Sequence, residues 1–228
     1  LHDECWSFGE YPGSDIEPLY GFKYAHQLYT RADANYSGQV TVPVLWDKKQ
    51  HTIVNNESAD IVRMLNSGFG ALADNTVDLY PAEFRAEIDA VNERLYDSFN
   101  NGVYQAGFAS SQFAYEEAVA KVFASLEYLQ QQLEGQDYLV GNRLTEADIR
   151  AFVTLIRFDS AYYGLFKTNL AQIRDYPNIV AYMQRIYALP GIADTVNFDH
   201  IKQGYYSIKM LNPLGIIPQG PDLSYITG

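Results

Sequence analysis

The stretch over residues 36–66 constrains the fold more than any other part of the sequence. Residues 40–46 are apolar and largely β-branched, which predicts a buried strand. Pro43 lies inside this run and cannot donate to a ladder, so its segment is expected to be an edge strand or to carry a special turn. The charged residues 47–50 predict a turn, and residues 51–54 predict a second short strand.

A helix is expected directly after the second strand. Asn56 or Ser58 should cap it, because the apolar residues that follow recur at helical spacing. Backbone N–H groups and the positive end of the helix dipole would then point into the loop over residues 55–58, which favours a bound carboxylate. Glu57 in this loop can hold an ammonium group.

Val42 adds a third group to this pattern. It precedes Pro43, and its backbone N–H and C=O can pair with an extended peptide if the Val42-Pro43 bond is cis. A small zwitterionic peptide would satisfy all three groups together. From the residues alone, an ordinary β-hairpin followed by a helix explains the pattern equally well.

The remainder of the chain predicts helices. We expect α/β structure over residues 1–70, with a first helix over 19–33, and an all-helical domain over residues 71–228. The helices expected in that domain cover 81–99, 111–133, a segment capped by Thr145 and Asp148, a segment opened by Pro177, and 191–208, before an extended tail from Asn212.

Composition excludes several classes of partner. The net charge of −12 argues against nucleic acid and anionic membranes, which would repel an acidic surface. No apolar run reaches the roughly 18 residues of a membrane-spanning helix, and the four histidines show no metal-ligand spacing. A single cysteine excludes an internal disulfide framework and favours a reducing compartment, so we expect the cytoplasm.

Several long motifs in order resemble one family. They are TVPVLWD and TIVNNES with the following IVRMLN, CWSF near the start, NNGVYQAGFA at 100–109, GNRLTEADIRAFVTLIRFD at 141–159 and PGIADTVNFDHIKQGYY at 190–206. This pattern resembles the glutathione transferase superfamily, and more narrowly its xi class, the glutathionyl-hydroquinone reductases. The resemblance implies an incomplete thioredoxin-like domain followed by an all-helical domain. The family's Cys-Pro-Trp-Ala signature does not occur in these 228 residues, so the nucleophilic cysteine is expected upstream of Leu1.

The resemblance also assigns a thiol-binding set. Trp6, Val42, Glu57 and Ser58 match family positions that contact glutathione. Gln39 stands where the family usually has arginine, and the loss of that cation removes a charge-assisted contact to a carboxylate. The resemblance therefore implies glutathione as cosubstrate, and Gln39 leaves another low-molecular-weight thiol open.

Tyrosines form the implied acceptor site. Tyr104 and Tyr205 match tyrosines that face the acceptor pocket, where a phenol can hydrogen-bond a quinol oxygen and assist proton transfer. Tyr162 could line the same pocket, while Gly204 replaces a histidine often found there. With 19 tyrosines in the chain, ordinary packing explains most of them. Cys5 does not match the family nucleophile and is expected to be structural or incidental, with a stand-in nucleophile as the alternative.

The implied function is that of a thiol-dependent reductase. It would remove glutathione from glutathionyl-hydroquinones through a cysteine mixed disulfide. Small quinol conjugates, and no nucleic acid or membrane, are the expected partners, and the family implies a homodimer. The alternative is a non-catalytic module with a transferase-like fold that binds a ligand or another protein.

Overall fold

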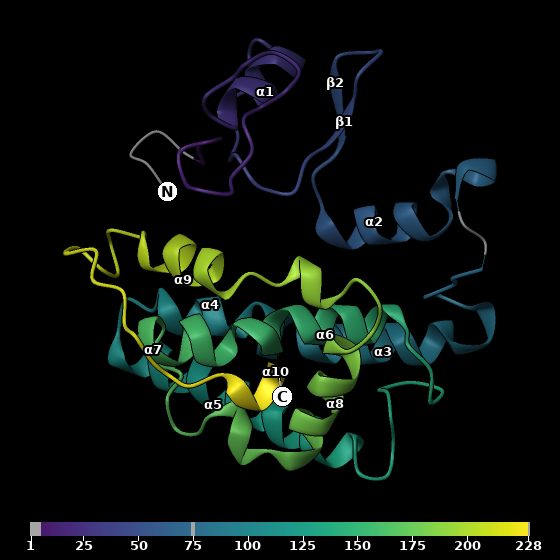
Figure 1. Cartoon of the computed structure of the whole chain (residues 1–228), viewed down its shortest axis with the longest axis vertical. Coiled ribbons are helices and arrows are strands. Elements are labelled where there is room, and N and C mark those ends of the chain that lie inside the picture. The colour runs from purple at the N-terminus through teal and green to yellow at the C-terminus, as the bar shows by residue number, and fades with distance from the viewer. Residues whose placement is uncertain (1–5, 74–75, 228) are drawn as a thin grey trace. The chain divides into compact units, whose positions relative to one another are not determined.

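The computed structural model describes residues 6–73 and 76–227. The chain separates into two compact units, one ending at Asp78 and the other beginning at Leu79 (Figure 1). The sequence predicts a boundary near residue 70. We refer to these parts as the N-terminal unit and the C-terminal unit.

The N-terminal unit contains a small antiparallel sheet and helices. Its elements are α1 (His26–Ala32), β1 (Leu45–Asp47), β2 (Thr52–Asn55), α2 (Ser58–Arg63), a π-helical turn η1 (Met64–Gly68) and a 3-10 turn η2 (Gly70–Leu72). Trp46 of β1 lies opposite Ile53 of β2. Helix α1 packs against β2.

Helix α1 is shorter than the predicted helix over residues 19–33. The carboxylate of Glu17 accepts three backbone N–H groups at 2.7, 2.8 and 3.1 Å, from Leu19, Tyr20 and Phe22. Gly21 has a φ of +68°, which no helix contains. The Glu17 carboxylate therefore closes a turn over this segment, and α1 begins only at His26.

The predicted strand over residues 40–46 is also wrong in extent, because β1 begins at Leu45. The Val42-Pro43 bond is cis. Within the described residues the sheet has two strands, so the residues before Leu45 have no ladder partner. The cap of α2 differs as well. Neither Asn56 nor Ser58 is the N-cap, since Glu57 takes that position and accepts the Ala59 N–H at 3.5 Å.

The C-terminal unit is all-helical over its described residues, as predicted. Its elements are η3 (Ala82–Phe84), α3 (Arg85–Leu95), η4 (Tyr96–Asn100), α4 (Gly102–Gly107), α5 (Gln112–Gln132), α6 (Glu146–Arg157), η5 (Phe158–Tyr162), α7 (Tyr163–Leu165), η6 (Ile173–Asp175), α8 (Pro177–Tyr187), η7 (Ala193–Thr195), α9 (Phe198–Tyr206) and α10 (Ser224–Thr227). Turns η4 and η5 are π-helical.

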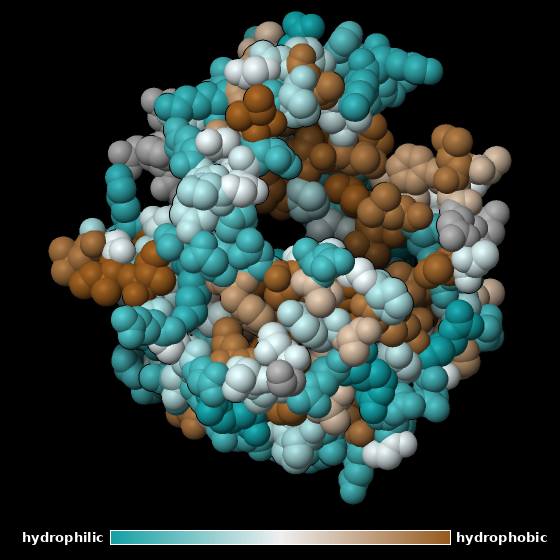
Figure 2. All heavy atoms as spheres, in the orientation of Figure 1, coloured by the Kyte–Doolittle hydropathy of each residue, from teal (hydrophilic) through white to brown (hydrophobic). Residues whose placement is uncertain are grey.

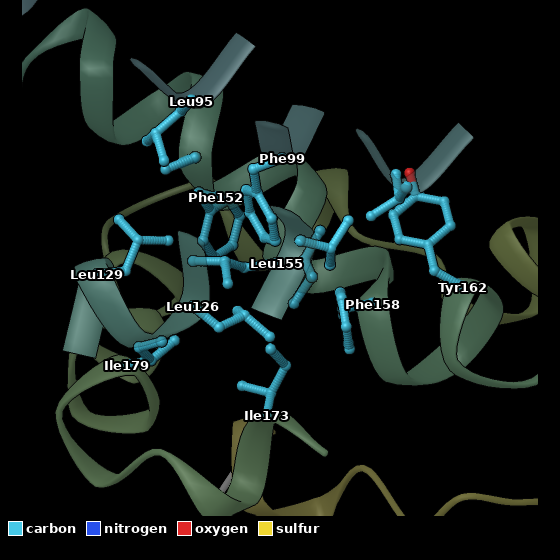
Figure 3. Packing of buried hydrophobic residues seen from close by; sticks show 14 of the residues in the cluster. Leu95, Phe99, Leu126, Leu129, Phe152, Leu155, Phe158, Tyr162, Ile173 and Ile179 are labelled. Carbon is cyan, nitrogen blue, oxygen red and sulfur yellow. The ribbon is translucent and has the colours of Figure 1, made fainter. Parts of the chain in front are cut away.

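Local signals place three of these helices correctly. Ser111 caps α5 by accepting the Ala114 N–H at 3.2 Å. Thr145 and Asp148 form the predicted capping box of α6, in which the Thr145 N–H donates to Asp148 at 2.7 Å. Pro177 begins α8. These helices bury aromatic and aliphatic side chains that interlock in one core (Figure 3).

Three differences from the sequence prediction arise in this unit. The predicted interruption at residues 100–102 is followed by a short helix, α4. Helix α9 begins at Phe198 rather than near 191, because the Asn197 side chain caps it by accepting the His200 N–H at 3.0 Å. The tail is not extended throughout, since α10 forms near its end and packs beside α8 (Figure 1).

The segment between α9 and α10 carries exposed apolar side chains. Met210, Leu214 and Ile216 are largely exposed. The loop that follows α9 in Figure 1 lies at the left edge, where Figure 2 shows a brown group of hydrophobic residues. This surface contrasts with the closely packed core of the same unit.

Candidate functional site

Three tyrosines of the C-terminal unit meet at their hydroxyl groups. Tyr104 lies on α4, Tyr162 ends η5 and Tyr205 lies on α9. The hydroxyl oxygens of Tyr104 and Tyr205 are 2.6 Å apart, and those of Tyr162 and Tyr205 are 2.9 Å apart. We call these three residues the tyrosine cluster. The structure therefore brings together both predicted acceptor tyrosines and Tyr162, which the sequence analysis named as a further residue of the same pocket.

Close helix packing holds the cluster in place. Phe166 is fully buried, and its ring stacks on Tyr162 with centroids 5.2 Å apart. A Cβ at Gly107 would fall 2.4 Å from the Phe166 ring, so only glycine allows α4 to approach this closely. The ring of Tyr104 packs against the same phenylalanine, with the two ring centroids 5.4 Å apart. The apolar ring of Phe166 thus packs against the rings of all three tyrosines.

The tyrosines of the cluster differ in how far their side chains are exposed to solvent. Tyr162 is 2% exposed, whereas Tyr104 is 37% exposed. Burial, and then the phenols of Tyr205 and Tyr104, raise the pKa of Tyr162. Burial, and then Tyr104, raise the pKa of Tyr205, and these effects outweigh the lowering by its hydrogen bond with Tyr162, so both hydroxyls stay protonated at neutral pH. The buried Tyr162 hydroxyl has the other phenols as its polar neighbours and can donate to Tyr205. Tyr205 can then donate to Tyr104, which leaves the Tyr104 hydrogen for an outside acceptor.

The predicted thiol-binding residues all belong to the N-terminal unit. Val42 is half-exposed, and within the described residues its backbone N–H and C=O have no partner. Glu57 caps α2, and Ser58 is the first residue of that helix. Val42 can therefore pair with an extended ligand in the way the sequence predicts. We call Val42, Glu57 and Ser58 the thiol seat.

Trp6 and Gln39 lie in the same unit, where their backbone carbonyl groups accept hydrogen bonds. The Trp6 C=O accepts the Ala25 N–H at 2.9 Å, and the Gln39 C=O accepts the Tyr36 hydroxyl at 2.6 Å. Among the described residues, no hydrogen bond or ring contact joins either side chain to the thiol seat. Cys5 lies outside the described residues.

The sequence did not indicate that Phe166 and Phe108 pack beside the tyrosine cluster. The Phe108 side chain is 42% exposed. The ring of Phe108 packs edge-to-face against Phe166, with the ring centroids 5.6 Å apart. Each follows a cluster tyrosine by four residues, since Tyr104 precedes Phe108 and Tyr162 precedes Phe166. Residues at this spacing share a helix face, so the repeated Tyr-x-x-x-Phe pattern was an available signal.

The described residues hold no group of three or more histidine, cysteine, aspartate or glutamate side chains arranged for a metal ion. Among the described residues, no helix combines the length and the apolar character needed to cross a membrane.

Comparisons with known proteins agree with this architecture. Residues 112–185 match a family described as the C-terminal domain of glutathione S-transferases. The chain is 54% identical over 218 residues to the glutathionyl-hydroquinone reductase YqjG of Escherichia coli, a match that covers 95% of this chain and 66% of that protein. It is 49% identical over 224 residues to the glutathionyl-hydroquinone reductase PcpF of Sphingobium chlorophenolicum, covering 97% of this chain and 71% of that protein.

A solved structure gives the same relationship. The chain superposes with a TM-score of 0.94 and 53% identity on the glutathione-bound structure of YqjG, a glutathione transferase homologue from Escherichia coli K-12, covering 97% of this chain and 72% of that chain. The expected glutathione transferase fold is thus confirmed. Because relatives about half identical match nearly the whole sequence, the chain belongs to the glutathione transferase superfamily, in its group of glutathionyl-hydroquinone reductases and xi-class transferases.

Proposed function

We propose that the protein is a glutathione-dependent reductase that removes glutathione from glutathionyl-hydroquinones. The observation that supports this most is the tyrosine cluster, in which the exposed Tyr104 hydroxyl can donate to a ligand when Tyr162 and Tyr205 donate along the cluster towards it. A quinol presents phenolic oxygens that such a donor can bind. The relatives at 49–54% identity are named for this activity.

The thiol seat supplies the cosubstrate side of the proposal. An extended tripeptide would pair with the free N–H and C=O of Val42, while its γ-glutamyl end would meet Glu57 and Ser58 at the start of α2. Trp6 would line the same site. Gln39 offers a neutral amide where the family has a cation, so we expect weaker attraction for a glutathione carboxylate at that position.

The chemistry requires a cysteine thiolate. The thiolate attacks the sulfur of the glutathionyl-quinol, the carbon–sulfur bond breaks, and the ring carbon takes a proton. The products are the free quinol and a mixed disulfide between the enzyme and glutathione. A second glutathione thiolate attacks this disulfide, releasing glutathione disulfide and regenerating the cysteine. Tyr104, supported by Tyr205, would hold the quinol oxygen and assist proton transfer during the first step.

We place the nucleophile outside these 228 residues, with Cys5 as the alternative. The chain spans 66% of the Escherichia coli reductase and 71% of the Sphingobium reductase, so it does not represent their whole length. The proposal also includes the cytoplasm as location, which the single cysteine favours, and a homodimer, which analytical ultracentrifugation would measure.

Turnover of a glutathionyl-hydroquinone tests the function. The full-length protein with glutathione should release quinol and glutathione disulfide in equal amounts. A cysteine-to-serine change in the upstream motif should abolish turnover. Activity that survives this change but is lost in Cys5→Ser would move the nucleophile to Cys5. No turnover by the wild-type protein would favour the non-catalytic binding module.

A further inference from the structure

Tyr29 of α1 joins two distant segments of the N-terminal unit. Its side chain is 3% exposed. Its hydroxyl donates to the Thr41 C=O at 2.7 Å and lies 3.3 Å from the Thr41 N–H. The Asn56 side-chain amide donates to the same hydroxyl at 3.1 Å and to the Thr41 Oγ1 at 2.8 Å. We call Tyr29, Thr41 and Asn56 the Tyr29 network.

Two members of the Tyr29 network are sequence neighbours of thiol-seat residues. Thr41 directly precedes Val42, and Asn56 directly precedes Glu57. Within the described residues the backbone polar groups of Val42 have no partner of their own, so its position depends on its neighbours. Asn56 and Thr41 are hydrogen-bonded to each other as well as to Tyr29. These hydrogen bonds fix the distance between the segment that contains Val42 and the start of α2.

We propose that Tyr29 is a positioning residue for thiol binding: its buried hydroxyl sets the distance between the Val42 backbone and the start of α2, so that one zwitterionic thiol peptide reaches both. This inference rests on the proposed function. Tyr29 need not touch the thiol, because it acts through Thr41 and Asn56. A buried hydroxyl with partners on two segments fixes geometry more firmly than apolar packing, which is non-directional.

Tyr29→Phe tests the inference because it keeps the ring and removes the hydroxyl. Calorimetry of the full-length protein with glutathione should show binding weakened about tenfold, which is about 1.4 kcal/mol. In turnover assays the KM for glutathione should rise while kcat at saturating thiol stays unchanged. Tyr20→Phe is the matched control, since it removes another phenol of the same unit, whose partner is His51 at 2.6 Å. It should leave glutathione affinity unchanged.

A second variant separates positioning from general destabilisation. Asn56→Ala should weaken binding as Tyr29→Phe does, and the double variant should lose no more than the weaker-binding single variant, because both changes break one network. If Tyr29→Phe does not fold, Asn56→Ala alone carries the test. Wild-type affinity in both single variants, or an equal loss in Tyr20→Phe, would overturn the inference while the proposed function stands. Absence of glutathione binding by the wild type would overturn both.

Discussion

Single hydroxyl groups determine what the tyrosine cluster can do. Tyr205 occupies the middle of the cluster and contacts both other hydroxyls. Its oxygen can accept from Tyr162 while its hydrogen goes to Tyr104. Whether Tyr104 can donate its hydrogen to a ligand therefore depends on a residue 101 positions away in sequence.

Tyr205→Phe should separate this role from packing. The change leaves the buried Tyr162 hydroxyl without its main partner, which should cost about 1–3 kcal/mol in the free energy of unfolding. If the cluster assists proton transfer, kcat for the quinol conjugate should fall about 100-fold. Steady-state kinetics would measure this. The control is Tyr115→Phe, which breaks a hydrogen bond to the Lys167 C=O outside the cluster. Equal kcat values in the two variants would contradict the proposed role.

Glu17 makes the N-terminal unit sensitive to acid. Burial acts to raise the pKa of its carboxyl, but the N–H groups of Leu19, Phe22 and Tyr20 outweigh it and hold the pKa below its usual 4.5. A carboxyl with a lowered pKa in the folded state contributes stability above pH 4.5, and this contribution disappears as the pH falls through the folded-state pKa. Both tryptophans, Trp6 and Trp46, lie in this unit.

Tryptophan fluorescence of the 228-residue chain should therefore report loss of structure in the N-terminal unit as the pH falls below 4.5 and through the lowered pKa of Glu17. Glu17→Gln removes the titrating group while keeping an acceptor oxygen. This variant should be less stable at neutral pH and should show a shallower acid transition. An acid transition of unchanged steepness would show that another carboxyl controls it.

The start of α6 is held by a buried capping box. The Asp148 carboxylate is fully buried and accepts from Thr145 at 2.7 and 2.9 Å, from the Leu139 N–H at 2.9 Å and from the Tyr182 hydroxyl at 3.1 Å. It therefore joins the helix cap to the preceding loop and to α8. A catalytic role for this residue is not needed to explain its burial.

Asp148→Ala should be strongly destabilising. It removes the cap and leaves several buried donors without an acceptor, so we expect a loss of about 3 kcal/mol in the free energy of unfolding. The control is Asp175→Ala, which removes the corresponding carboxylate from the exposed capping box of η6, where Asp175 accepts the Gln172 N–H at 2.8 Å. Its cost should stay below about 1 kcal/mol. Urea denaturation would measure both, and equal losses would contradict this interpretation.

Elements with local signals were predictable from the sequence. Helices α5, α6 and α8 each combine an apolar stripe with a cap or an initial proline. Elements that depend on partners were not. Residues 40–44 look like a strand, but a strand forms only where another lies beside it. Helix α4 depends on the absence of a side chain at Gly107 beneath Phe166, a contact between distant residues.

The same division applies to the candidate site. The resemblance named Tyr104 and Tyr205, whereas periodicity alone would have left them as packing residues. Val42 was indicated by its position before Pro43 as well as by the resemblance. Neither approach identified Tyr29, because its hydrogen bonds reach Thr41 and Asn56, 12 and 27 residues away. Contacts of this kind depend on the folded chain and have no local sequence pattern.

The two units differ in how much hydrophobic core each contains. The buried apolar residues of the C-terminal unit form one large cluster (Figure 3). Among the described residues of the N-terminal unit, the buried apolar side chains are those of Ala25, Leu28 and Tyr29. A core of this size stabilises a fold only marginally.

A fragment covering residues 79–228 should therefore fold by itself. We expect a helical circular dichroism spectrum and a cooperative thermal transition, because the large core lies entirely within it. A fragment covering residues 1–78 should show little cooperative structure. A cooperative transition in the smaller fragment combined with none in the larger one would contradict this assignment of stability.

Glutathione calorimetry on the full-length protein would show whether the Val42 backbone and the start of α2 bind a thiol tripeptide. We expect saturable heat with one glutathione per chain, and a weaker affinity in Glu57→Gln, which removes the charge that would hold the ligand's ammonium group. A folded protein that takes up neither glutathione nor another small thiol would contradict it.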